Sequence, residues 1–295
     1  MKVHNFILSF FMLNDYQKSV LYMTLASLSF AIMSFMVRLA GDIPLYEKVL
    51  FRNLIALIIT LVLIAKNRDS IWGQKKNRIF LILRALSGLA GVFLYFHSIT
   101  YLNISDGTML NKLSPFFVIL FAGLFLKEKL GKHKILAMSI AFLASLLIIK
   151  PHFQMEMAPA ITGFASAIFS GFAYTMIRLL NTRGEKSATI VFYFSFISFI
   201  VVLPFAIANF VMPTTIQWLY LLGIGVFAGM GQLLITESYH YARASDVAPY
   251  QYMHVLFTAI ISILFLQEAP DIFSILGSLI IVSAFIYLYK KADAA

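Results

Sequence analysis

Cysteine is absent from this chain of 295 residues. Without thiols the sequence excludes disulfides, thiolate nucleophiles and metal sites built on cysteine. Charge is also scarce, because charged residues make up 12% of the chain, against about 25% in ordinary soluble domains. Together with a hydrophobic share of 61%, this scarcity disfavours a soluble fold and predicts an integral membrane protein.

The sequence also lacks the usual motifs of catalysis and cofactor binding. His97 and His240 have no second ligand at the helical spacing that a zinc site requires. No glycine-rich phosphate loop with its lysine is present, and the connectors are too short to hold a nucleotide-hydrolysing domain. We therefore expect no enzymatic activity, no metal and no cofactor.

Long hydrophobic runs, separated by short polar connectors, fill the chain. A helix of about twenty apolar residues crosses a hydrocarbon core of roughly 30 Å. The sequence predicts an all-α membrane protein with ten transmembrane helices. These helices are expected to start near Ser19, Tyr46, Ile79, Ser105, Lys134, Pro159, Ala188, Ile216, Ser245 and Ile272.

The chain repeats itself at an offset of 140 residues. Residues 101–148 and 241–288 share twelve identities in 48 ungapped positions, where chance in so biased a composition gives roughly four. This pattern predicts a duplicated five-helix unit. The expected boundaries are an N-terminal interfacial segment at residues 1–18, a first repeat at 19–150 and a second repeat at 155–291.

The two copies differ most in their lysines. FLKEKLGKHK at 125–134 becomes FLQEAPDIFS at 265–274, which keeps Phe-Leu-x-Glu but loses all four lysines. Positive connectors are retained on the cytoplasmic side of a membrane, and a unit of five helices reverses direction when duplicated. We therefore predict two inverted repeats, with both termini cytoplasmic, in a bacterial inner (plasma) membrane. Inverted repeats of this kind are typical of secondary transporters.

Three stretches resemble the EamA family of the drug/metabolite transporter superfamily. They are YLNISDGTMLNKLSPFFVILFAGLFLKEKL, FRNLIAL and ASDVAPYQYMHVLFTAIISILFLQEAP. The resemblance extends over nearly the whole chain. It implies ten helices around a central cavity that opens alternately to the two sides of the membrane. It does not identify a substrate, because similar proteins carry many kinds of small solute.

The leading functional hypothesis is a secondary transporter or exchanger of a small polar metabolite, such as an amino acid or a related organic solute. The alternative is a non-transporting membrane scaffold or a lipid-handling protein. The expected partners are the small-molecule substrate and the lipid bilayer, with a homodimer left open. Nucleic acid is not expected, because the lysines and arginines behind the net charge of +10 lie in short connectors.

Lys112 is the first candidate for substrate binding. It is predicted to lie about 10 Å deep in the fourth helix, on roughly the same face as Thr108. A charge at that depth must face protein or a wet cavity. It either attracts an anionic group of a substrate, or it snorkels outward or pairs with an acidic neighbour.

The ninth predicted helix carries polar residues at every fourth position. These are Asp246, Tyr250, His254, Thr258 and Ser262. The spacing predicts one polar face, with Tyr250 and His254 as candidates for substrate binding. His254 is also the best candidate for proton coupling, although a buried histidine that only bonds neighbouring helices is the plainer alternative.

Other polar residues have less specific patterns. Gln232 and Tyr95 are expected near the cavity as substrate-binding residues, and the glycines around them as helix-packing positions. Glu237, with His240 and Arg243 nearby, is a candidate for gating or proton coupling, or else part of a wet interfacial cluster. Arg52 is expected to make pairing or helix-end contacts. Glu128 and Glu268 occupy the same place in both copies, and we expect each to hold the amino end of the following helix.

Overall fold

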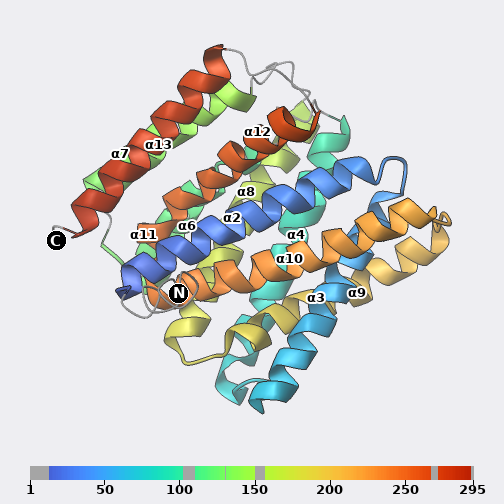
Figure 1. Ribbon diagram of the computed structural model, residues 1–295. Helices are drawn as coiled ribbons and strands as arrows, with labels where there is room; N and C mark the ends of the chain where they lie inside the picture. Colours follow the sequence, from blue (N-terminus) through green and yellow to red (C-terminus); the bar gives the residue numbers. More distant parts are fainter. Residues whose placement is uncertain (1–12, 102–109, 130, 150–156, 267–271, 294–295) are drawn as a thin grey trace, which may run out of the picture.

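The computed structural model describes residues 13–101, 110–129, 131–149, 157–266 and 272–293, and every regular element in these ranges is a helix (Figure 1). The first half contains α2 (Asp15–Leu39), α3 (Leu45–Asn67), η1 (Lys75–Asn77), α4 (Arg78–Tyr101), α6 (Ser114–Leu126) and α7 (Lys132–Ile149). The second half contains α8 (Met157–Thr182), α9 (Ser187–Ala208), α10 (Thr215–Tyr241), α11 (Ala244–Val247), η2 (Ala248–Tyr252), α12 (Met253–Leu266) and α13 (Ile272–Asp293).

Seven helical segments in the described ranges are long and apolar enough to cross a membrane. They include the whole of α2, α3, α8, α9 and α10. The prediction of ten spans is therefore met only in its coarser form, a multi-pass helical membrane protein. α6 has 13 residues. At about 1.5 Å per residue, this helix is shorter than the thickness of a hydrocarbon core, roughly 30 Å.

The helix packing pairs one repeat with the other. α2 lies along α10, and α4 lies along α8 (Figure 1). Each of these pairs joins the first helix of one repeat to the third helix of the other, so the two pairs are equivalent. α3 packs on α9, and α7 packs on α13, so these equivalent helices face each other. The chain thus has the two-repeat architecture that the sequence predicts.

Glycines permit the closest of these approaches. A Cβ atom at Gly91 of α4 would lie 2.7 Å from Oγ of Ser170 in α8. A Cβ atom at Gly231 of α10, which is 140 residues later, would lie 2.8 Å from the ring of Phe30 in α2. Small residues allow such close helix contacts where lipid offers no hydrophobic drive. The packing role expected for these glycines fits this geometry.

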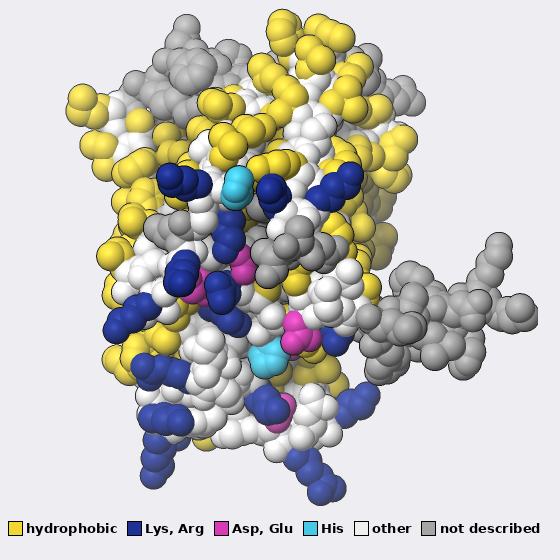
Figure 2. All heavy atoms as spheres, turned by 90° about the vertical axis from the view of Figure 1, so that its left-hand side faces the viewer, with side chains coloured by type: hydrophobic (Ala, Val, Ile, Leu, Met, Phe, Trp, Pro, Cys, Tyr) yellow, Lys and Arg dark blue, Asp and Glu magenta, His cyan; other side chains and the backbone are white. Residues whose placement is uncertain are grey.

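Basic residues gather at one end of the bundle, which we call the charged end. This end holds the beginning of α2, the end of α13 and the connector between α3 and α4. In Figure 2, lysine and arginine side chains are spread over the middle and lower part of the face shown, and hydrophobic side chains predominate in the upper part. The described connector 209–214, at the opposite end, carries no charged residue.

Two predicted helices are interrupted at matching places. The ninth was expected to be continuous from near Ser245, but it consists of α11, the 3-10 helix η2 and α12. Because a 3-10 helix has about three residues per turn, the predicted four-residue stripe does not stay on one face. In the fourth helix, Lys112 and Leu113 form a turn before α6 begins. Pro115 therefore lies in the first turn of α6, where its missing N–H costs no helical hydrogen bond.

Candidate functional site

A cavity of about 210 Å³ lies where the two repeats meet. Its walls come from α2, α3, α4, the start of α6 and the residues just before it, α8, α10, η2 and α12. The polar lining residues used below are Arg52, Tyr95, Lys112, Tyr174, Gln232 and His254. Mostly preformed, concave spaces with a few convergent polar groups are the usual form of small-molecule sites.

Lys112 and His254 meet at the two interrupted helices. Nζ of Lys112 lies 3.1 Å from Nδ1 of His254, and both side chains line the cavity. The hydroxyl of Tyr252 donates a hydrogen bond of 2.7 Å to the carbonyl of Lys112. Irregular backbone at membrane depth is tolerated where it lines a cavity. The interruptions of these two equivalent helices therefore place a cation and an imidazole side by side.

The other predicted site residues divide into two groups. Tyr95 and Gln232 line the cavity. Tyr250 does not line it, because its hydroxyl lies 3.0 Å from that of Tyr16, near the charged end. Glu237 is half-buried on α10, away from the cavity, and forms no ion pair with any residue that the structure describes. Thr108 lies outside the described residues.

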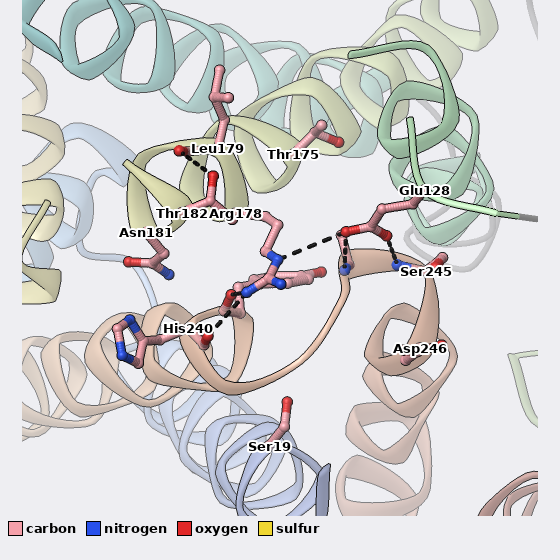
Figure 3. A network of polar contacts seen from close by, with 12 residues as sticks. Ser19, Glu128, Thr175, Arg178, Leu179, Asn181, Thr182, His240, Ser245 and Asp246 are labelled. Carbon is pink, nitrogen blue, oxygen red and sulfur yellow. Dashed lines mark hydrogen bonds and ion pairs between the residues drawn. The ribbon is translucent and has the colours of Figure 1, made fainter. Parts of the chain in front are cut away.

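At the charged end, Glu128 joins the two repeats (Figure 3). Its carboxylate accepts hydrogen bonds from the backbone N–H groups of Ala244, at 3.1 Å, and Ser245, at 3.0 Å. Oε1 of Glu128 also lies 3.7 Å from Nε of Arg178. The expectation that Glu128 holds the helix that follows it was wrong, because it holds the beginning of α11, 116 residues away.

Arg178 extends this network to α10. Its Nη1 atom donates hydrogen bonds of 2.9 Å to the carbonyls of Tyr239 and His240, at the end of α10 (Figure 3). An ion pair between Lys134 and Asp246 links α7 to α11 close by. We call the residues Glu128, Arg178, Lys134 and Asp246 the end network. Together they link the segment after α6 with α7, α8, α10 and α11 at the charged end.

Sequence reasoning missed Arg84, which lies in the middle of α4. Arg84 is 2% exposed, and its Nη2 donates a hydrogen bond of 3.1 Å to Oε1 of Gln232. Its guanidinium carbon lies 4.1 Å from the ring centroid of Phe194, and that of Arg52 lies 5.7 Å from the same centroid. The available signal was a charge inside the apolar run RIFLILRALSGLAG, where ionisable residues mark functional positions.

Comparison with known proteins gives a family match over most of the chain. The sequence model of the EamA-like transporter family matches residues 17–150 and 157–290. A solved crystal structure that is 14% identical to this chain superposes on it with a TM-score of 0.78. The superposition covers 90% of this chain and 94% of the other, and it supports the fold alone.

Several named relatives are similar over most of their length. A pseudopaline exporter of Pseudomonas aeruginosa is 33% identical over 283 residues, which cover 95% of this chain and 99% of the exporter. A riboflavin transporter of Brucella anthropi is 27% identical, with 82% of this chain and 86% of the relative covered. Solute carrier family 35 member G1 of Homo sapiens is 26% identical, with 89% and 76% covered.

Proposed function

This chain belongs to the EamA-like transporter family, and on that premise we propose that it is a secondary transporter which moves a small polar metabolite by alternating access. The observation that carries the proposal is the polar cavity between the two repeats, lined by Lys112 and His254. Two related halves around a central site offer two exchangeable conformations. An amino acid or a related organic solute fits the size and polarity of this cavity.

We further propose ten spans in two inverted repeats, with both termini in the cytoplasm. α2 begins at the charged end, where Tyr16 contacts Tyr250, whereas the equivalent helix α8 finishes there, where Arg178 contacts Tyr239. Equivalent helices therefore run in opposite directions. The positive-inside rule places the charged end in the cytoplasm of a bacterium.

In this arrangement the end network is the cytoplasmic gate. Opening the cavity to the cytoplasm requires α10 and α11 to separate from α6 and α8, which breaks the contacts of Glu128 and Arg178. Conformational change between packed helices proceeds between discrete arrangements, since cores are not continuously deformable. His254, beside Lys112 in the cavity, is the residue we propose for proton coupling.

Export is the direction of movement that we propose. Two relatives from Pseudomonas aeruginosa strains, each 33% identical to this chain, are named pseudopaline exporters. A relative named riboflavin transporter indicates that the family scaffold accepts metabolites of different chemistry. The cargo proposed for this chain is accordingly defined by the cavity and not by any one relative.

Site-directed labelling tests alternating access directly, because the natural chain contains no cysteine. Ser34 lines the cavity on the part of α2 remote from the charged end, and Ser245 is buried beneath Glu128. Single cysteines at these positions are expected to react with a membrane-impermeant maleimide from opposite sides of the membrane. The cysteine-free chain is the blank. If both cysteines are reached from one side only, the scaffold alternative replaces transport.

A further inference from the structure

The cavity carries positive charge without compensating negative charge. Arg52 and Lys112 line it, and Arg84 lies behind the lining residue Gln232. None of the lining residues that the structure describes is acidic. Within the same described ranges, no carboxylate forms an ion pair with any of these three cations. Buried charges in proteins are normally paired. Here the described chain supplies no negatively charged partner for these three cations.

Arg84 shows the deficit most clearly. Its side chain is 2% exposed, and Gln232 supplies one acceptor for Nη2. Nε and Nη1 are buried and have no hydrogen-bond partner in the described chain. A guanidinium has five N–H donors and no acceptor, and a neutral amide satisfies only part of them. The positive charge of Arg84 is therefore only partly compensated by the described groups around it.

The position of Arg84 is held by its surroundings. A Cβ atom at Gly88, one helical turn later, would lie 2.4 Å from Nη1 of Arg84 and 3.0 Å from the ring of Phe194. Glycine at position 88 therefore leaves the space in which the guanidinium lies against Phe194. Because Arg52 lies over the same ring, the two cations share one small region beside Gln232 and Tyr174.

We propose that the cargo is an organic anion, that Arg52 binds one of its acidic groups, and that Arg84, behind Gln232, positions Gln232 and adds positive charge to the same region. This inference rests on the proposed transport function and specifies its substrate class. Carboxylate and phosphate share the planar or forked oxygen geometry that a guanidinium binds in two contacts. Lys112, in the turn before α6, supplies a point charge for a second acidic group. The bound anion supplies the negative charge that the described lining residues lack.

Gln232→Glu is the sharpest test, because it places a carboxylate where Arg84 already makes a hydrogen bond of 3.1 Å. The internal carboxylate is expected to pair with the guanidinium and to compete with an external anion. Unfolding temperature of the purified full-length protein in detergent is measured with citrate, with inorganic phosphate and with sodium chloride at equal ionic strength. Wild type is expected to unfold at a higher temperature with citrate or phosphate than with chloride.

In the Gln232→Glu variant this increase should be lost, while its unfolding temperature without added anion is equal to or above that of wild type. Arg52→Met should weaken the anion response by about tenfold in concentration, as expected when a charged contact is removed. Arg183→Met is the matched control, because Arg183 also lies 4.1 Å from a phenylalanine ring centroid, that of Phe80, but on the exposed surface. The control should respond as wild type does.

Two results would overturn the inference. One is an absence of any increase with citrate or phosphate in wild type, and the other is an increase of equal size in Gln232→Glu. Labelling at Ser34 and Ser245 is independent of both results. Alternating labelling without an anion response would retain the transporter and reject the anionic cargo. One-sided labelling with an intact anion response would reject alternating access.

Discussion

At the scale of single residues, the buried charges of the cavity are expected to lower the free energy of unfolding. Lys112 has His254 as its neighbour and no ion pair with a carboxylate in the part of the chain that the structure describes. An ionised group with incomplete pairing away from water is costly. Residues selected for function commonly oppose stability in this way. Lys112 and Arg84 therefore differ from lysines of the connectors, whose charges are solvated.

Lys112→Met provides a prediction at this scale. Because methionine keeps the length of the side chain and removes the charge, the variant should gain roughly 1 to 2 kcal/mol in free energy of unfolding. Chemical or thermal unfolding in detergent measures the change. The control is Lys129→Met, since Lys129 is exposed and its replacement should alter stability by less than about 0.5 kcal/mol. A clear loss of stability in Lys112→Met would instead show that Lys112 supports the fold.

At the scale of elements, short breaks in helices determine where the polar groups lie. The turn at Lys112 and the 3-10 helix η2 occupy matching places in the two repeats. Close to η2, Glu128 binds two backbone N–H groups at the beginning of α11, so that the segment just after α6 holds part of the other repeat. Figure 3 shows how Arg178 extends this contact to the end of α10. The gate that we propose at this end thus depends on a few polar contacts between helices.

Glu128→Gln should open that end. The amide keeps one acceptor but loses the charge that faces Arg178 and the second backbone N–H group, which weakens the closed state by about 1.5 to 3 kcal/mol. In a Ser245→Cys background, cytoplasmic maleimide labelling should therefore become faster by about tenfold or more. Equal labelling rates with and without Glu128→Gln would remove Glu128 from the gate.

Glu185→Gln is the matched control for that experiment. Glu185 is also a buried carboxylate at the charged end, and it accepts hydrogen bonds from the backbone of Gln74 and the side chain of Asn77. Its contacts join the connectors of α3–α4 and α8–α9, away from α11. Its replacement should lower stability without changing the labelling of Cys at position 245.

At the scale of the whole molecule, charge and helix direction are the basis of the orientation that we propose. Lys129 follows α6 at the charged end, and Met212, 73% exposed, lies in the uncharged connector between α9 and α10. In intact bacterial cells, an impermeant maleimide should label Met212→Cys but not Lys129→Cys. Lysed cells should label both. If Lys129→Cys is the one labelled in intact cells, the proposed orientation is reversed.

The helical class, the duplication and the family could be predicted from the sequence, because each depends on periodic or long-range patterns that single residues do not disturb. The twelve identities at an offset of 140 and the loss of four lysines are properties of the chain itself. Tyr95, Lys112, Gln232 and His254 were also placed at the cavity by their polarity within apolar runs. Burial of polar groups in a membrane is costly, so such residues stand out.

Only the tertiary structure decided which polar residues meet. The spacing of Tyr250 and His254 predicted one face, but the 3-10 turn sends Tyr250 to Tyr16 and leaves His254 beside Lys112. Arg84 reaches Gln232 across 148 residues, and Glu128 reaches Ser245 across 117. Such contacts depend on how packed helices cross and where their backbones break, and local sequence patterns do not determine either. Hydrophobicity therefore determined that the chain enters a membrane, and packing decided where its charges lie.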